Sequence, residues 1–447
     1  MCDRRRAGSD PGMTEARLRT SGNPETVLRQ LFDAAVASAL PASCVAAHLP
    51  DIPRGRTVIV GAGKAAAAMA RAVEDVWSGP VSGLVIVPYG HGVSCRHVQV
   101  VEASHPVLDE AGLKATETLI GHLEGLAADD LVLCLLSGGA SALLAAPVQG
   151  VTLADKQAVT RALLRSGATI AEINCVRKHL SAVKGGRLAR LAAPARVVTL
   201  ALSDVPDDDP STIGSGPTVP DPTTREAALT ILERDVPEIP DVIRDHLLDP
   251  ASETPKPDPD HPPDVRIIAT PAKAIAAAAD LARILGYEPL VLGSDLEGEA
   301  AVVAQDHAVL VRAILAGDGL ISPPCALLSG GETTVKVRGS GRGGRNGEFL
   351  LALAIALDGA PGVHALAADT DGIDGSDDNA GAVIGPDVLD AAARLGMSAF
   401  ERLADNDAYG FFTRVGGLIV TGPTRTNVND FRAILIDRPD VSSQDPA

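Results

Sequence analysis

The sequence predicts an α/β protein with two domains: a larger amino-terminal domain on a mainly parallel, Rossmann-like sheet, and a smaller carboxy-terminal α/β domain. The length of 447 residues suggests two or three domains, and 46% hydrophobic residues suffice for a sizeable core. Aromatic residues make up only 2%, so the core must be aliphatic, which suits helices packed on buried parallel strands. Short apolar runs alternate with helical patterns, which is typical of α/β proteins.

Apolar periodicity and turn residues locate the individual elements. An apolar stripe predicts a first helix at 25–48. The strands predicted for the larger domain cover 57–60, 83–87, 131–136, 196–202, 265–269 and 289–292, and its helical patterns include 153–166, 226–232 and 271–285. In the smaller domain, segments 326–328 and 333–337 flank a Ser-Gly-Gly-Glu turn, followed by a helix at 348–356 and apolar segments at 364–368 and 416–420.

These elements divide the chain into four parts. Residues 25–319 form the expected larger domain, with a proline-rich loop at 251–264, and residues 320–436 form the smaller one. We expect residues 1–24 to be a disordered extension, within which Met13 is an alternative start, and residues 437–447 to be a disordered tail.

Composition excludes several classes of function. The formal charge of −18 argues against general nucleic-acid binding, which needs a basic field, but allows a small anionic ligand in a locally cationic cleft. No apolar run reaches the roughly 18 residues that span a membrane, and the start of the chain lacks the apolar segment of a secretory signal. Six cysteines without a CxxC pair favour reduced thiols, so we expect a cytoplasmic protein.

Loops rich in Gly, Ser, Asp or Lys follow at least five predicted strands, where open α/β sheets bind ligands. The first is Gly61-Ala-Gly63-Lys64. A dinucleotide-binding turn is disfavoured because the next strand ends in Pro88 rather than an acidic residue, and no Ser or Thr follows Lys64 to complete a Walker A loop. An anion contact through Lys64 competes about evenly with a plain tight turn.

The next loops add candidate anion and metal ligands. The loop from Ser137 to Ser141 either forms an anion nest or is a turn of small residues. Arg177 and Lys184 are predicted to lie near one face of a helix, where they bind an anion or face solvent. Asp204, at the tip of a strand, is a candidate base or Mg²⁺ ligand, although its acidic loop could equally be a solvated turn.

Two loops of the smaller domain carry further charge. Arg345 lies in a glycine-dense cationic loop suited to neutralising a transferring phosphoryl group. Asp369 and Asp371 belong to an Asp-Thr-Asp-Gly motif, for which a Mg²⁺ or hydroxyl-binding role competes with a turn held by Asx hydrogen bonds.

Taken together, these motifs resemble the MOFRL-type glycerate 2-kinases, a family sometimes labelled hydroxypyruvate reductases. The resemblance extends in the family's order from residue 25 to residue 436. Its matching segments are 60–65, 104–109, 136–144, 174–188, 202–205, 213–223, 329–335, 341–348, 369–375, 380–382 and 422–430. The chain departs from the family pattern at Asp207, where Gly is usual, at Ala140, which replaces a third glycine, and at Gly347, where Gln is usual.

The resemblance implies an active site in the cleft between two α/β domains that uses ATP, Mg²⁺ and D-glycerate, in a monomer or homodimer with no nucleic-acid or membrane partner. It implies catalytic roles for Lys64, Asp204 and Arg345. The expected phosphate-binding residues are Gly61, Gly63, Ser137, Gly138, Gly139, Ser141, Arg177, Lys184, Gly343, Gly344 and Asn346, and the expected metal ligands are Asp369 and Asp371. The alternatives are an NAD(P)H-dependent hydroxypyruvate reductase and a non-catalytic protein that binds phosphometabolites.

Overall fold

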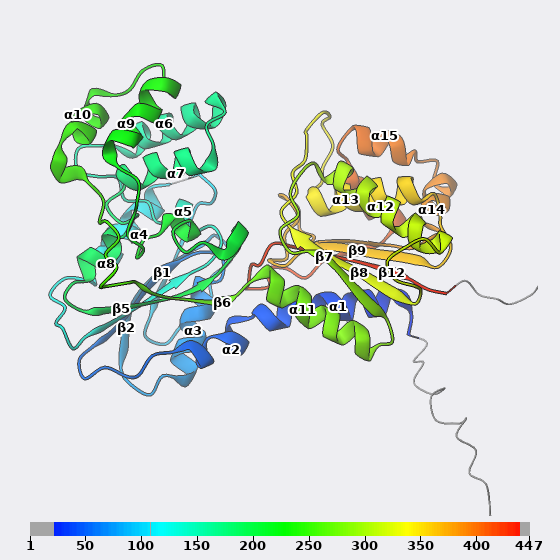
Figure 1. The fold of residues 1–447 in the computed structure, drawn as a ribbon, viewed down its shortest axis with the longest axis horizontal. Coiled ribbons are helices and arrows are strands. Elements are labelled where there is room, and N and C mark those ends of the chain that lie inside the picture. The colour runs from blue at the N-terminus through cyan, green and yellow to red at the C-terminus, as the bar shows by residue number, and fades with distance from the viewer. Residues whose placement is uncertain (1–21, 108, 439–447) are drawn as a thin grey trace, which may run out of the picture.

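The computed structural model describes residues 22–107 and 109–438, which form two lobes side by side (Figure 1). The first lobe is built on a six-stranded sheet in the order β3-β2-β1-β4-β5-β6, and every neighbouring pair is parallel. Its strands are β1 (Thr57–Ala62), β2 (Val81–Pro88), β3 (Gln99–Ala103), β4 (Leu131–Leu136), β5 (Arg196–Leu202) and β6 (Asp264–Ala269). This is the strand order of a doubly wound fold, so the predicted parallel Rossmann-like sheet is confirmed.

Helices cover this sheet and add a further layer. The helices are α3 (Ala66–Val76), α4 (Glu110–Gly121), α5 (Ala140–Leu143), α6 (Leu153–Ser166), α7 (Ile170–His179), α8 (Arg187–Ala192), α9 (Arg225–Asp235) and α10 (Asp241–Leu248). Helices α6, α7, α9 and α10 share an apolar cluster of their own, and Figure 1 shows them grouped away from the sheet. Thr152 and Thr169 begin α6 and α7 with complete capping boxes, which fix where these helices start.

The second lobe has a mixed six-stranded sheet in the order β11-β10-β9-β12-β8-β7. Its strands are β7 (Glu288–Gly293), β8 (Cys325–Gly331), β9 (Val363–Asp369), β10 (Gly381–Ile384), β11 (Leu418–Ile419) and β12 (Asp430–Ile436), and only β7 and β8 pair in parallel. One face packs on α12 (Ala300–Ala316) and α13 (Arg345–Leu357), with α14 (Val388–Arg394), α15 (Ala399–Ala404) and α16 (Ala408–Val415) around them.

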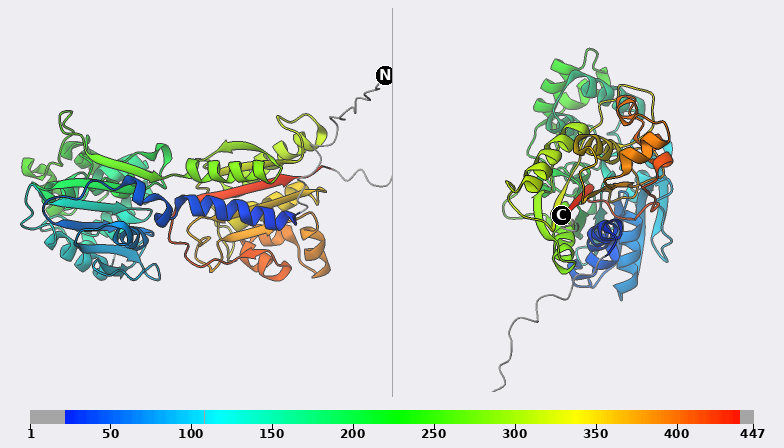
Figure 2. Two further views of the ribbon diagram at one scale, coloured as in Figure 1. Left: turned by 90° about the horizontal axis from the view of Figure 1, so that it is seen from below. Right: turned by 90° about the vertical axis from the view of Figure 1, so that its right-hand side faces the viewer.

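The other face of this second sheet is covered by the first helix of the chain. Helix α1 (Pro24–Ala39) packs beside α11 (Pro271–Ile284) and against β12, and Figure 2 shows it running along the second lobe. The predicted helix over 25–48 ends earlier than expected. Pro41 disfavours a helical conformation at Leu40, and the chain continues as the short helix α2 (Pro41–Cys44) and the 3-10 turn η1 (Ala46–His48).

The assignment of residues 271–319 to the first domain was wrong. The chain leaves the first sheet at the end of β6, and Pro271 begins α11 on the second sheet, where β7 pairs with β8. Local sequence patterns did not reveal that the chain passes to the second sheet here. A strand-helix-strand segment has the same hydrophobic pattern whichever sheet its last strand joins. The second lobe therefore includes α1, α11, β7 and α12 in addition to the carboxy-terminal segment.

Several further predictions need correction. Segment 333–337 forms only a bridge at Thr334, and β3, β10 and β12 were not predicted. Asp437 belongs to the fold rather than to the expected tail, because its carboxylate accepts a hydrogen bond from Tyr287 at 2.9 Å. Asn23, placed in the expected extension, accepts a capping hydrogen bond from the Glu25 amide. Met13 and residues 439–447 lie outside the described residues.

Two expectations from composition can be compared with the described part of the chain. No helix there is long and apolar enough to cross a membrane. The five cysteines within it are free thiols.

Candidate active site

The two lobes meet at the carboxyl ends of β1, β4 and β5, beside the point where the strand order of the first sheet reverses. This is where doubly wound sheets bind ligands. The predicted catalytic residues all place a charged side chain in this region: Lys64, Asp204 and Arg345. Carboxylates of the second lobe link the two cations, Lys64 and Arg345.

Lys64 follows the tip of β1 and reaches across to the second lobe. Its Nζ lies 2.5 Å from Oδ2 of Asp371, and 23% of the lysine side chain is exposed. Burial by itself lowers the pKa of Lys64, but the carboxylates of Asp371 and Asp369 outweigh it and raise the pKa above its ordinary value. Lys64 is therefore a fixed cation at the boundary between the lobes.

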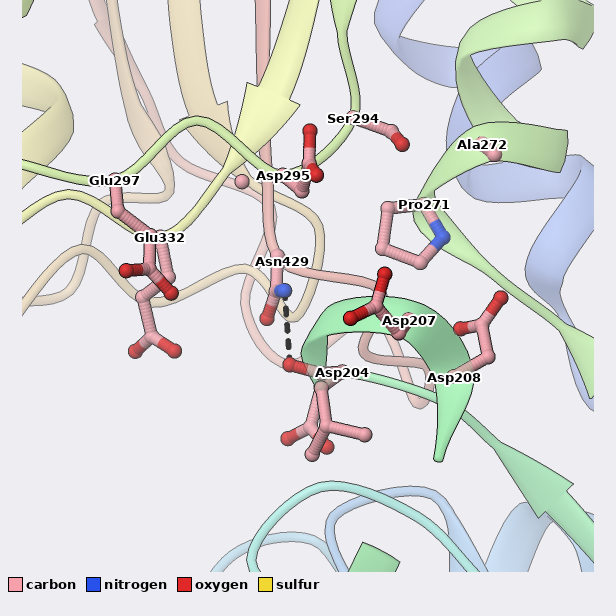
Figure 3. Close-up of a pocket in the computed structure, with 12 residues that line it drawn as sticks. Asp204, Asp207, Asp208, Pro271, Ala272, Ser294, Asp295, Glu297, Glu332 and Asn429 are labelled. Atoms are coloured by element: carbon pink, nitrogen blue, oxygen red, sulfur yellow. Dashed lines mark hydrogen bonds between the residues drawn. The ribbon is translucent and has the colours of Figure 1, made fainter. Parts of the chain in front are cut away.

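Asp204 follows the tip of β5, and two asparagines of the second lobe hold it. Asn427 Nδ2 lies 3.3 Å from the carboxylate, and Asn429 Nδ2 donates to the Asp204 carbonyl oxygen at 2.9 Å (Figure 3). Burial and the nearby negative charge of Glu332 raise the pKa of Asp204 to about 6, although Lys64 opposes the shift. A carboxylate with this pKa is ionised at neutral pH and is a better proton acceptor than an ordinary aspartate.

Arg345 begins α13 and is surrounded by acidic side chains. Its Nε bonds both oxygens of Asp430 at 2.9 and 3.0 Å, and its other nitrogens bond Asp369 at 2.8 Å and Glu332 at 2.9 Å. The carboxylates, Asp430 first, raise the pKa of Arg345 despite its burial. Because Asp369 also acts on Lys64, the predicted metal residues Asp369 and Asp371 join the two cations into one network.

The sequence analysis assigned no role to Asp430 or Arg432, which complete this network. Arg432 is fully buried, donates to Asp430 at 2.7 Å and lies over the ring of Phe349. Both residues lie on β12, a strand that was not predicted because charged residues interrupt its apolar run. Their spacing of two, which places both on one face of a strand, was the available signal.

The expected phosphate-binding residues at the start of α13 already have protein partners. The carboxylate of Asp374 accepts hydrogen bonds from the amides of Asn346 and Gly347 at 3.0 and 2.9 Å, so it occupies the helix terminus. The Asn346 side chain is buried and donates to Asp430. Gly343 and Gly344 line an open cavity of about 600 Å³ together with Arg345.

The Gly61–Lys64 turn is also engaged within the protein. The amides of Gly63 and Lys64 donate to the carbonyl oxygens of Ile86 at 3.0 Å and Gly138 at 2.9 Å. Gly61 lies inside β1, where a Cβ would come within 2.1 Å of the Leu135 carbonyl oxygen. These glycines bring β1 close to β4, and the turn does not offer its amides as a dinucleotide-binding turn does.

The Ser137–Ser141 loop separates two parts of the site. Ser137 Oγ accepts from the Ala65 amide at 2.9 Å, which ties the loop to the Lys64 turn. A Cβ on Gly138 would lie 2.3 Å from Oδ2 of Asp204, whereas one on Gly139 would lie 2.9 Å from His105. Gly138 thus packs against the Asp204 carboxylate, and Gly139 faces a different cavity.

That different cavity also receives Ser141, Arg177 and Lys184. The predicted helix face is not what brings the two cations together, because α7 ends at His179 and Lys184 lies in the following loop.

Asp207 has a left-handed backbone, φ 57°, at the position where the family usually has glycine.

An acidic cavity of about 170 Å³ adjoins Asp204 (Figure 3). It is lined from the first lobe by Asp204, Asp207 and Asp208, and from the second lobe by Asp295, Glu297 and Glu332. Within the described residues, no group of three or more His, Cys, Asp or Glu side chains is arranged to hold a metal ion. Asp369 and Asp371 are instead bonded to Arg345 and Lys64.

A doubly wound lobe, a mixed α/β lobe and a charged cleft between them define a two-domain α/β enzyme. The profile of the Domain of unknown function DUF4147 matches residues 27–248, and that of the MOFRL family matches residues 325–430. The chain is 39% identical to the D-glycerate 2-kinase of Thermotoga maritima over 91% of this chain and 98% of that protein. It is 52% identical to an Agrobacterium vitis protein whose name marks it as an unconfirmed hydroxypyruvate reductase, over 92% and 94% of the two chains.

The crystal structure of a Thermotoga maritima glycerate kinase superposes with a TM-score of 0.86 at 38% identity, covering 92% of this chain and 99% of that one. The chain belongs to the MOFRL-type glycerate kinase family, which confirms the resemblance inferred from its motifs.

Proposed function

We propose that this protein is a glycerate 2-kinase, which transfers the γ-phosphoryl group of ATP to the 2-hydroxyl of D-glycerate and releases 2-phosphoglycerate and ADP. The observation that carries the proposal is the meeting of Lys64, Asp204 and Arg345 between the lobes of a protein from this family. Phosphoryl transfer depends mainly on positioning and charge stabilisation, which such a set can supply without a Walker A loop.

In this mechanism Asp204 accepts the proton of the 2-hydroxyl while the hydroxyl oxygen attacks the γ-phosphorus. The bond from the γ-phosphorus to the bridging oxygen breaks, and the electron pair leaves with ADP. The raised pKa of about 6 makes Asp204 a base matched to neutral pH. Asn427 and Asn429 orient Asp204 from the opposite lobe, so the base is positioned only when the lobes are in contact.

Lys64 and Arg345 supply the positive charge for the reaction. Both now pair with carboxylates, so a phosphoryl oxygen or the glycerate carboxylate would replace or share those partners. Donors aimed at the developing charge stabilise the transition state, and the loss of one such donor typically costs about 10²–10³ in rate.

The residues present fit a magnesium ion that also binds phosphate oxygens. Mg²⁺ prefers oxygen ligands and commonly uses only one or two carboxylates beside water and phosphate. We propose Asp369 and Asp371 as its ligands. Burial and then the negative charge of Asp371 raise the pKa of Asp369, and a bound cation would lower that pKa again. When bound, Mg²⁺ would offset charge on the transferring phosphates.

A coupled assay tests the proposal. Protein, D-glycerate, ATP and Mg²⁺ are combined with enolase, pyruvate kinase and lactate dehydrogenase, so that 2-phosphoglycerate is reported as loss of NADH. A signal that requires glycerate, ATP and Mg²⁺ supports the kinase and the 2-position. ADP formation without NADH loss would indicate the 3-isomer, and neither product would refute the kinase.

A nicotinamide-dependent reductase is the weaker candidate. The first sheet has the strand order of dinucleotide-binding domains, but the Gly63 and Lys64 amides are already bonded, and β2 ends at Pro88 without the acid that would bind a ribose. We further propose that the enzyme is cytoplasmic, which agrees with its free thiols, and that it is a monomer or a homodimer.

A further inference from the structure

A cavity in the first lobe lies outside the carboxylate network of the cleft. Its volume is about 450 Å³, and it is bounded by α6, the Ser137–Ser141 loop and the segment after β3. Four cationic side chains line it: Lys156, Arg177 and Lys184, and the exposed Arg161. No Asp or Glu is among the described residues that form its walls.

These cations lack the partners that buried charges normally have. Lys156 is only 4% exposed, and its Nζ has no hydrogen-bond partner. Lys184 is 1% exposed and donates to the Ser141 carbonyl oxygen at 2.7 Å. None of the ion pairs formed within the described residues includes Lys156, Arg177 or Lys184, although buried charges are usually paired.

The protein alone therefore leaves strong positive charge uncompensated in this cavity. Burial, reinforced by the charges of Arg177 and Arg187, lowers the pKa of Lys156 to about 7. Burial and the charge of Lys156 likewise lower the pKa of Lys184. An anion with several charges would relieve this repulsion and supply the missing hydrogen-bond acceptors.

The cavity adjoins the proposed reaction centre. The Ser137–Ser141 loop is the shared wall, since Gly138 packs against Asp204 while Gly139 and Ser141 line the cavity. His105 is part of the cavity wall. Burial lowers its pKa, and the positive charge of Lys64 lowers it further. One end of an extended anion in the cavity would thus face Lys64 and Asp204.

Size and polarity distinguish between the two substrates. Glycerate has three carbons and a single negative charge, whereas the cavity volume is in the range of sites for drug-sized ligands. Val107 and Leu164, which are 62% and 60% exposed, form an apolar part of its wall. Four cations beside an apolar surface match a polyphosphate attached to a planar base.

We propose that this cavity is the nucleotide site, in which Lys156, Arg177 and Lys184 bind the phosphate chain of a nucleoside triphosphate and the apolar wall contacts its base. The inference rests on the proposed kinase function, and it gives Lys156 a role that sequence analysis did not. The Ser137–Ser141 loop would then direct the γ-phosphate toward Asp204.

The test is the substitution Lys156→Met, with Lys114→Met as the control because Lys114 is an exposed lysine on α4. Calorimetry measures binding of the non-hydrolysable analogue AMP-PNP with Mg²⁺ and without glycerate, and the coupled assay measures KM for each substrate. We expect Lys156→Met to weaken AMP-PNP binding and raise KM for ATP about 10- to 100-fold, while KM for glycerate and the control stay unchanged.

Folding is monitored separately, and Arg177→Met is a second variant of the same cavity. Because Lys156 has no partner, its replacement should leave Tm unchanged or higher. Unchanged AMP-PNP affinity in both variants, or a rise in KM for glycerate alone, would overturn the nucleotide site. Wild-type protein that binds AMP-PNP but forms no 2-phosphoglycerate would refute the kinase function while leaving the nucleotide site standing.

Discussion

Asp204→Asn is expected to inactivate the protein while making it more stable. The folded state raises the pKa of this carboxyl from 3.8 to about 6, so ionised Asp204 opposes folding. A shift of about 2 units corresponds to about 3 kcal/mol. Asparagine keeps an oxygen that can accept from Asn427, and it removes the charge.

The sign of the pH dependence follows from this raised pKa. The cost of ionised Asp204 is absent well below its unfolded pKa of 3.8, where it is protonated in both states, grows as pH rises from about 4 to 6, and is complete above its folded pKa of about 6. Asp204→Asn should therefore stabilise the protein by up to about 3 kcal/mol at pH 8 and by about half of that at pH 5. Urea unfolding at the two pH values measures the difference, with Asp33→Asn, an exposed carboxylate on α1, as the control.

The same variant should lose about 10²–10⁴ in kcat in the coupled assay, which is the typical contribution of a general base. Wild-type turnover in Asp204→Asn would refute the assignment of Asp204 as the base. A variant that is no more stable than wild type at pH 8 would instead refute the argument from its burial, whatever its activity.

The remaining predictions concern neighbouring parts of the site. Lys64→Ala should lower kcat about 10²- to 10³-fold with an intact fold by circular dichroism; unchanged turnover would contradict its role. Arg345→Ala should abolish activity and also cost about 3–5 kcal/mol in urea unfolding, because Asp369 loses its ion-pair partner and Asp430 loses one of its two; a wild-type midpoint would show that the network is not stabilising. Gly138→Ala should reduce kcat, since its Cβ would lie 2.3 Å from the Asp204 carboxylate, and a crystal structure of the variant would show whether Asp204 moves. In wild type, kcat/KM should rise with pH with a midpoint near 6, and a flat profile from pH 5 to 8 would argue against Asp204 as the titrating base.

Two strands were predicted with the bounds that the structure shows, and both are mostly apolar. The segments 131–136 and 196–202 coincide with β4 and β5, because strands buried on both faces need mainly apolar residues, and the one charged residue among them, Arg196, lies exposed at the start of β5. β12 was missed since Asp430 and Arg432 lie within it, and their charge is tolerated only because they pair with each other and with Arg345. That compensation comes from residues far away in the sequence.

Glycine-rich loops identified the region of the site better than the function of each residue. Gly61 and Gly63 were expected to meet phosphate, yet they bring the strands close together, and the amide of Asn346 is taken by Asp374. Such loops have the same local pattern whether an external anion or an internal carboxylate fills them. At Asp207, by contrast, the family pattern did indicate the local backbone. The positive φ of Asp207 agrees with the family's preference for glycine at this position.

The sequence by itself determined the α/β class, the family and the charged residues on which the proposed chemistry depends, because these follow from apolar periodicity and from motifs in a given order. Only the tertiary structure decided that α1, α11, β7 and α12 belong to the second lobe. It also decided that Asn427 and Asn429 hold Asp204, and that Lys156 lies unpaired beside Arg177 and Lys184. The physical reason is that burial and pairing depend on contacts between distant segments, and such contacts set the pKa of Asp204 and leave the charge of Lys156 uncompensated.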